Sequence, residues 1–460
     1  MLRVAVVGTW ISLLAICYGH VAEDGLEGTI VFPQALESRS EDGAKVIKVA
    51  DDLVLTLRKS ANVFGENIIV RSFKDGGHME EHLLDAAEFE KDLYQDEDKM
   101  AAVAVKDKEG ALQMEGVLGL GRRIRPVPEM ERSDSGHMAH LLYEVDEGDS
   151  RHTRAVREAR HRVQVSERQY GSSIYMPSTI YPEVYVISDS LHTSYFKHGY
   201  RSAVEYYGIF INAVNLRYKS VSNPKVWVRI MGITLNSAEQ DRNYIFPVPR
   251  KPSDYIWGVE SLYNLTHYIA REHLYSVYDI VFPRPGTTCW DTKVKDGTPI
   301  TGALDSKAPL VDYYKTGIGE DWYRRFTGVH TFAHEIAHIL GCPHDGEASP
   351  SNLGNPPGAT HCPWNDGYIM SYKDTGLNHF KFSQCCNDMI SYIARRNPCL
   401  RVVNVPKEKR IRATKFPGSA ISLSKQCSWW YPSVTETYAM TSHAMGICLV
   451  KCYMPKYYLG

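Results

Sequence analysis

The stretch that organises this 460-residue chain is His334-Glu335-Ile336-Ala337-His338-Ile339-Leu340-Gly341-Cys342-Pro343-His344-Asp345. On a helix, His334 and His338 stand one turn apart and present two imidazoles to one point, with Glu335 beside them. Gly341 comes three residues after His338, where a residue without a Cβ can take a left-handed conformation and end the helix. The chain then turns back, so that His344 supplies a third imidazole.

Three neutral imidazoles leave the fourth position of a tetrahedral Zn²⁺ open to water, which is typical of catalytic rather than structural zinc sites. A short His-Glu-x-x-His match also arises by chance on exposed helices. The longer pattern argues against chance, because Gly341, His344 and Asp345 coincide with it and a Gly367-Tyr368-Ile369-Met370-Ser371-Tyr372 stretch follows about 25 residues later. We therefore predict a single Zn²⁺ held by His334, His338 and His344, with Glu335 as the general base.

These motifs resemble those of the metzincin metalloproteases, and the aspartate directly after the third histidine is similar to the adamalysin (reprolysin) branch. Two further stretches, Cys362-Pro363-Trp364-Asn365-Asp366 and Phe382-Ser383-Gln384-Cys385-Cys386, look like the secreted reprolysin-like metalloproteases of tick saliva. The resemblance runs from about Ile174 to Leu400. It implies a metalloendopeptidase with one catalytic zinc, in which a water activated by zinc attacks the peptide bond with help from Glu335.

The resemblance also assigns supporting roles around the metal. Met370 would form an apolar floor beneath the zinc, and Asp345 would make structural hydrogen bonds rather than bind the metal. Tyr372 is open between two roles. A methionine-x-tyrosine turn resembles the astacin and serralysin branches, where the hydroxyl stabilises the transition state, but adamalysins generally lack it and a tyrosine often only packs.

The remaining pattern of residues 174–400 predicts an α/β (α+β) fold. Apolar or alternating runs at 184–187, 225–233 and 276–282 indicate strands, and amphipathic segments between them indicate helices. Strand, helix, strand, helix, strand implies a mainly parallel sheet with crossover helices. The active-site helix is expected over 328–341, and a closing helix capped by Ser383 over 382–397.

The start of the chain predicts secretion. Arg3 precedes an apolar run from Val4 to Cys17 that is too short to span a membrane, so residues 1–22 are interpreted as a signal peptide, and no later segment is long enough to span. Residues 23–168 are interpreted as a propeptide with little regular structure beyond short strands such as 53–57. The catalytic domain would occupy 174–400 and a short cysteine-containing tail 401–460.

Arginine recurs every third residue near the end of this propeptide, at Arg151, Arg154, Arg157 and Arg160, with Arg162 close behind. A processing convertase is the expected partner at these Arg-x-x-Arg sites, with a charged amphipathic helix as the alternative.

Latency is open, because the propeptide lacks the cysteine that blocks the zinc in adamalysins. Asp134, His137 and His140 offer substitute ligands, or are ordinary surface residues.

Nine cysteines follow the predicted signal peptide, all from Cys289 onward, and secretion makes disulfides the default. Their odd number leaves one thiol unassigned. The connectivity among Cys342, Cys362, Cys385 and Cys386 stays open, while by resemblance Cys399 would reach back to Cys289. The tail is too short for the disintegrin array of larger relatives, and its Trp429-Trp430-Tyr431 cluster either contacts substrate or fills a small core.

A formal net charge of −2 argues against a nucleic-acid partner. The interpretation is a secreted zinc endopeptidase, made as a zymogen, that acts on extracellular proteins. By resemblance these would be fibrin, fibrinogen or gelatin at a blood-feeding site. Two alternatives remain, a non-catalytic secreted binder of host proteins and an endogenous matrix-remodelling protease. The sequence neither predicts nor excludes a Ca²⁺ site.

Overall fold

The computed structural model describes residues 26–145, 177–349 and 355–400, with gaps at 38–42, 74–77, 109, 120, 198, 248–254, 276–277, 285–287, 291–301, 304–314, 372, 374–375 and 398–399. Short pieces are also described at 20–21, 424, 427–428, 438–440 and 451–453. Residues up to Pro406 form one compact unit, and Lys407–Gly460 form a second. In the second unit, β22 (Tyr438–Met440) pairs with β23 (Lys451–Tyr453).

The N-terminal part of the first unit is a ten-stranded antiparallel sheet, which we call the N-terminal sheet. Its strand order is β1-β2-β12-β11-β10-β9-β8-β5-β4-β3. The strands are β1 (His20–Val21), β2 (Glu27–Val31), β3 (Gln34–Glu37), β4 (Lys45–Ala50), β5 (Leu53–Lys59), β8 (Leu93–Asp96), β9 (Ala101–Lys108), β10 (Ala111–Leu118), β11 (Arg122–Pro126) and β12 (His140–Glu144).

One face of the N-terminal sheet encloses its own core and the other packs on a helix. Along β5, Leu53, Leu55 and Leu57 alternate with exposed residues, so one face is apolar. Along β9, Val103 packs in that same core. Ala102 and Ala104 instead pack in a second core, which also contains residues of the predicted catalytic region. These small side chains let the long helix α4 (Tyr200–Tyr218) approach the sheet closely.

A second, five-stranded sheet has the order β18-β14-β16-β6-β7. The strands β14 (Glu183–Ser188), β16 (Arg229–Leu235) and β18 (Ile280–Arg284) come from the predicted catalytic region. The other two, β6 (Phe64–Phe73) and β7 (Met79–Asp85), come from the predicted propeptide. We call this the catalytic sheet. Three of its four pairings are parallel, and only β6 with β7 is antiparallel.

Two expectations are therefore wrong. The chain as a whole is a mixed α/β structure with mainly antiparallel sheet, since the N-terminal sheet has more strands than the catalytic sheet. Residues 23–168 are also far more regular than predicted. Strands such as β9, buried on both faces, lack the alternation of apolar and polar residues on which a strand prediction depends.

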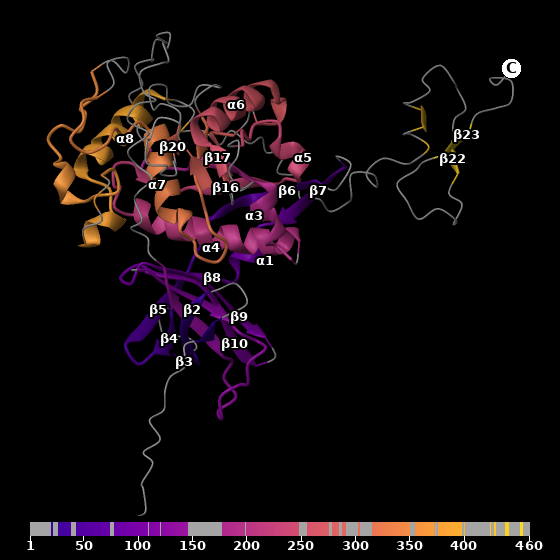
Figure 1. The fold of residues 1–460 in the computed structure, drawn as a ribbon, viewed down its shortest axis with the longest axis vertical. Helices are drawn as coiled ribbons and strands as arrows, with labels where there is room; N and C mark the ends of the chain where they lie inside the picture. Colours follow the sequence, from indigo (N-terminus) through magenta and orange to yellow (C-terminus); the bar gives the residue numbers. More distant parts are fainter. Residues whose placement is uncertain are drawn as a thin grey trace, which may run out of the picture. The chain divides into compact units, whose positions relative to one another are not determined.

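The helices that follow are α3 (Ser190–Ser194), α4, α5 (Ala238–Asp241), α6 (Gly258–Arg271), α7 (Gly328–Ile339) and α8 (Gln384–Arg396), and a short α1 (Ala87–Glu90) precedes β8. Helices α3 and α4 contact strands of the catalytic sheet. In Figure 1, α4 lies between the indigo strands of the N-terminal sheet and α7, and it contacts both. The helix predicted over 328–341 is present as α7, and Ser383 caps α8 by accepting a hydrogen bond from the Cys386 amide.

Short elements complete the unit. The two-stranded pairs are β13 (Thr179–Ile180) with β15 (Lys225–Val226), β17 (Tyr255–Trp257) with β19 (Thr288–Trp290), and β20 (Gly302–Ala303) with β21 (Gly317–Ile318). Single 3-10 turns lie at His273–Tyr275, Trp364–Asp366 and Gly376–Phe380.

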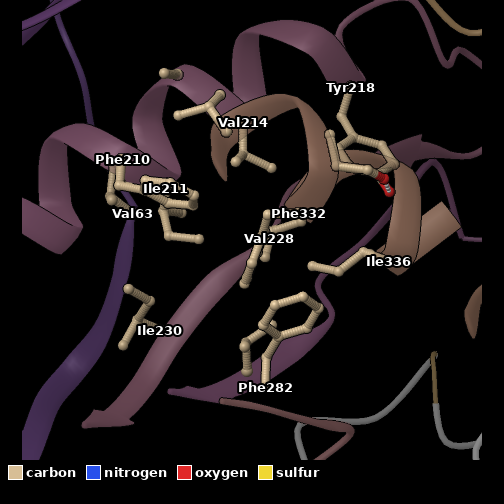
Figure 2. Close-up of a cluster of buried hydrophobic side chains, with 14 of the residues drawn as sticks. Val63, Phe210, Ile211, Val214, Tyr218, Val228, Ile230, Phe282, Phe332 and Ile336 are labelled. Atoms are coloured by element: carbon tan, nitrogen blue, oxygen red, sulfur yellow. Dashed lines mark hydrogen bonds between the residues drawn. The ribbon is translucent and has the colours of Figure 1, made fainter. Parts of the chain in front are cut away.

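A continuous apolar core joins the two sheets. It includes Val63, Phe64 and Val70 from the N-terminal part together with Phe332 and Ile336 of α7. Figure 2 shows Val63 beside side chains of α4, in the cluster that also contains Phe332 and Ile336.

Candidate active site

The structure brings the three predicted histidines together. His334 and His338 lie one turn apart on α7, and His344 returns from the loop that follows it. The three can offer nitrogen atoms that all lie within 4.8 Å of one another. The ring of His338 is nearly perpendicular to the rings of His334 and His344, with centroid separations of 4.6 Å. All three side chains are buried, and their nitrogens converge on one point.

Each of these imidazoles has its Nδ1 engaged by an acceptor. Nδ1 of His334 lies 2.8 Å from the carbonyl oxygen of Ile369, and Nδ1 of His338 lies 2.8 Å from that of Cys342. A carbonyl can only accept, so both Nδ1 atoms donate, and in the neutral ring Nε2 is the nitrogen that carries a lone pair. For His344, Nδ1 lies 3.3 Å from Oε2 of Glu347, which orients the third ring in the same way.

This donor set fits Zn²⁺. Nε2 of His338 and Nε2 of His344 are 3.1 Å apart, although neither carries a proton to share in the tautomers just deduced. Two such lone pairs repel unless a cation lies between them. In a tetrahedral zinc site, two nitrogens each about 2.05 Å from the metal are about 3.3 Å apart, close to the separation seen here.

Gly341 ends α7 in a way that aims the third ligand. Its φ of +99° lies in the region that favours glycine, and a Cβ there would lie 2.5 Å from Cγ1 of Ile393. The Cys342 amide donates to Ala337 and the Gly341 amide to His338, which is the hydrogen-bond pattern of a Schellman motif. The predicted turn at Gly341 is therefore present, and it carries the chain back toward α7.

The turn at Ile369 and Met370, which we call the methionine turn, makes hydrogen bonds to two parts of the site. The Ile369 carbonyl accepts from His334, and the neighbouring Met370 carbonyl accepts from the Asp345 amide at 3.0 Å. Met370 itself is fully buried in the core. The Asp345 carboxylate accepts from the Ser383 hydroxyl at 2.6 Å, so it joins the site to α8. Burial raises the pKa of Asp345 to about 6, against the effect of the Ser383 hydrogen bond.

Glu335 is buried on α7, with 2% of its surface exposed. Tyr218 of α4 donates to the carbonyl of Ala333 at 2.8 Å and so fixes α4 to this helix. The pKa of Tyr218 is raised well above its usual value, by burial first and then by the negative charge of Glu335. The aromatic side chains of α4, Tyr206, Tyr207, Phe210 and Tyr218, belong to the apolar core, and the Tyr218 hydroxyl makes this additional contact.

Sequence reasoning missed the group that starts the active-site helix. Asp321 is buried, and its Oδ1 accepts from the amide of Gly328, the first residue of α7, at 2.9 Å. Its Oδ2 accepts from the Tyr206 hydroxyl and lies 3.6 Å from Nε2 of His192. A carboxylate at a helix N-terminus satisfies an amide and interacts favourably with the helix dipole. No spacing rule identifies Asp321, because it lies seven residues before the amide that it caps.

Two disulfides brace the loops around the site. Cys342 pairs with Cys386 and Cys362 pairs with Cys385, which settles the connectivity among these four cysteines. Cys342 is therefore a bridge residue and no ligand. Cys427 is also disulfide-bonded, whereas the predicted partner of Cys289, Cys399, lies outside the described residues.

Several predicted features are not part of this arrangement. His140 lies in β12, where Nε2 accepts from the Met114 amide and Nδ1 donates to Met138, so both ring nitrogens are used. Among the described residues, Asp134 and His137 belong to no cluster that could hold a metal with the three histidines. Tyr372, residues 151–162, most of the predicted signal peptide and the Trp429-Trp430-Tyr431 cluster lie outside the described residues.

Three buried imidazoles aimed at one point, with a buried glutamate on the same helix, define the class as a metallopeptidase. A family model described as Metallo-peptidase family M12 (Reprolysin_5) matches residues 298–383.

Relatives agree with this class. A Bombyx mori protein named "A disintegrin and metalloproteinase with thrombospondin motifs like" is 28% identical over 413 residues, which cover 76% of this chain and 59% of that protein. The venom metalloproteinase antarease of Tityus serrulatus is 27% identical over 383 residues, which cover 79% of this chain and 90% of that protein. This chain thus spans 59% of the length of the Bombyx mori relative. Together with the histidine site, these matches support a zinc metalloendopeptidase.

Among solved structures, metalloproteinase-II from Bacteroides fragilis aligns with 74% of this chain and 88% of its own, at a TM-score of 0.34 and 9% identity, a similarity too low to bear on the fold. Within the described residues, no helix is both long and apolar enough to cross a membrane.

Proposed function

We propose that this protein is a secreted zinc endopeptidase, made as a zymogen, that hydrolyses peptide bonds of extracellular proteins. The observation that carries the proposal is the common orientation of the three imidazoles. Each Nδ1 faces an oxygen acceptor, and the three histidines can therefore turn their remaining nitrogens toward one metal ion.

His334, His338 and His344 would hold Zn²⁺, which would supply a Lewis acid to polarise the scissile carbonyl and lower the pKa of water. Glu335 takes a proton from the attacking water and delivers it to the nitrogen of the leaving amine, so that the peptide C–N bond breaks. Ile369, Cys342 and Glu347 keep the three rings in the tautomer that can bind a metal. Tyr372 is proposed as a further stabiliser of the transition state.

Secretion and processing are supported by the N-terminal apolar run and by the arginine-rich segment at residues 151–162. The relatives named as venom metalloproteinases are consistent with an extracellular role. The resemblance to tick salivary enzymes leads us to propose fibrin, fibrinogen or gelatin as substrates.

The test is cleavage of gelatin and fibrinogen by the processed protein, with and without a zinc chelator, alongside Glu335→Ala. Loss of the general base should lower turnover by about 10²–10⁴-fold while one zinc per chain is retained. Glu239→Ala is the matched control, because Glu239 is an exposed carboxylate on α5, outside the site.

Undiminished cleavage by Glu335→Ala would rule out the proposed base. A folded wild type that holds zinc but cleaves neither protein, nor a mixture of unrelated peptides, would instead favour the non-catalytic binder.

A further inference from the structure

The N-terminal part of the chain, residues 26–145, supplies the strand β6 to the catalytic sheet. Strand β6 pairs with β16 in parallel register, with Ile233 opposite Val70 and Thr234 opposite Arg71. The Ile230 amide also donates to the Val63 carbonyl at 3.0 Å, just before β6 begins. In the sheet order β16 lies between β14 and β6, so without β6 it would expose an edge of unpaired backbone groups.

A buried arginine fixes this strand in place. Arg71 of β6 is 7% exposed, and one of its amino groups donates to the Tyr185 hydroxyl of β14 at 2.8 Å. The other lies 2.7 Å from Glu81 of β7. Tyr185 in turn bonds to Thr234, so the arginine reaches past β16 to the next strand of the catalytic sheet. Withdrawing β6 would break a buried, charge-assisted contact.

Apolar packing extends this contact along α4. A Cβ on Gly208 would lie 3.1 Å from side-chain atoms of both Phe64 and Leu93, so the helix packs closely against the N-terminal part here. Asn212, on the same helix, donates to the Tyr94 carbonyl at 3.0 Å in a buried position. Val63 and Phe64 belong to the core that contains Ile336 of the active-site helix, and Figure 2 shows Val63 and Ile336 in this cluster.

The N-terminal sheet also holds the segment that leads into α7. Buried Arg123 donates to the Arg325 carbonyl at 2.8 Å, and the Tyr143 hydroxyl donates to the Arg324 carbonyl at 2.7 Å. Arg324 and Phe326 both have positive φ, at +64° and +51°, a conformation that non-glycine residues rarely adopt. The contacts from Arg123 and Tyr143 therefore stabilise an unfavourable backbone next to the active-site helix.

From these contacts we propose that the N-terminal part is not released when the chain is cut between the two parts. It remains bound without a covalent link, as a second chain whose β6 is a permanent strand of the catalytic sheet. This rests on the proposed processing within residues 151–162. No disulfide can join the two pieces, because residues 23–168 contain no cysteine.

The experiment uses the full chain, with a site-specific protease sequence replacing residues 154–160 so that the cut does not depend on a convertase. The Glu335→Ala background prevents self-digestion and makes the result independent of catalysis. After complete cutting, size-exclusion chromatography should give one peak that contains both fragments at low micromolar concentration, also in 1 M NaCl, since the contacts are apolar or buried and salt screens buried groups little. Denaturing gels of that peak should show two bands without any reductant.

Arg71→Leu tests the contact itself, and Arg122→Leu is the matched control. Both arginines lie on strands of the N-terminal part and pair with a carboxylate, but Arg122 pairs with Asp52 within the N-terminal sheet. Only the cut Arg71→Leu protein should release its N-terminal fragment at a lower urea concentration. Elution of the wild-type fragments in separate peaks, with the zinc-binding fragment monomeric and folded, overturns the proposal. Equal release from both variants removes Arg71 from it.

Discussion

Residues 26–145 and residues 340–400 reach an ordered structure in different ways. The first stretch contains no cysteine, and its strands form the N-terminal sheet and one edge of the catalytic sheet. The second has no strand among its described residues, yet it places His344 and Met370 beside α7 with two disulfides and α8. Backbone pairing orders the first region, while cross-links and single hydrogen bonds order the second. The following changes test this difference.

The largest effect is expected from removing the longer cross-link. Replacing Cys342 and Cys386 by serine removes a cross-link between residues 44 positions apart in the sequence. This should lower the free energy of unfolding by about 4 kcal/mol. Replacing Cys362 and Cys385, with a separation of 23, should cost about 0.5 kcal/mol less. Urea unfolding of both double variants would measure this. A loss below about 1 kcal/mol would mean that packing, and not the bridge, orders this region.

The N-terminal sheet should instead be sensitive to acid. Burial lowers the pKa of His140 in β12 from 6.5 to about 4, because the buried ring is shielded from water and its charged form is disfavoured. Below pH 6.5 the unfolded chain takes up a proton that the folded chain excludes. The free energy of unfolding therefore falls as the pH drops from about 6.5 to about 4, by about 3 kcal/mol in all.

His140→Gln removes this titration and keeps an acceptor for the Met114 amide. The unfolding free energy of wild type should fall relative to that of the variant by about 2.5 kcal/mol between pH 7.5 and pH 4.5. Groups common to both proteins, the metal ligands included, cancel in this difference. An unchanged difference would show that His140 is protonated in the folded protein at pH 4.5.

Gly341→Ala should cost about 2 kcal/mol, because a Cβ both strains the φ of +99° and overlaps Ile393. Gly110→Ala is the control for the dihedral alone, since its φ is +73° and no atom lies within 4 Å of the added Cβ. We expect the Gly341 variant to lose more stability and also zinc affinity, measured by thermal melts and metal titration. Equal losses would mean that Ile393 moves aside freely.

The smallest effect is expected at an exposed ion pair between the N-terminal sheet and α4. Nζ of Lys106 lies 2.6 Å from Oε1 of Glu205, but the two side chains are 33% and 42% exposed. Lys106→Ala should change the free energy of unfolding by only about 0.5 kcal/mol, and less in high salt. A cost above about 2 kcal/mol would show that surface charge, and not the buried contact of Arg71, holds the two parts together.

The sequence allowed the metal ligands to be predicted better than the fold around them. Three histidines and a glycine at fixed helical spacing are local features, and α7 with its Schellman turn follows from them directly. The alternation along β5 likewise marks a strand. By contrast, the pairing of β6 with β16 joins residues about 160 positions apart, and nothing in either strand specifies its partner.

The same limit applies to the supporting residues. Asp321 and Tyr218 act through tertiary contacts with the first residue and the backbone of α7. The mainly parallel sheet was predicted from one region alone, where strands and helices alternate. That pattern holds for three pairings of the catalytic sheet, but it carries no information about the antiparallel strands that precede it.

Two hydrogen bonds at the methionine turn close a ring whose other members are segments of the chain. From His334 the path runs along α7 to Gly341, on to Asp345, across to the Met370 carbonyl and back through the Ile369 carbonyl to His334. Such a ring restricts the three imidazoles before any metal bond is counted, so metal entry requires little loss of chain entropy. Metal exchange should then proceed without unfolding. In hydrogen–deuterium exchange, the Asp345 amide would stay protected while zinc leaves and returns.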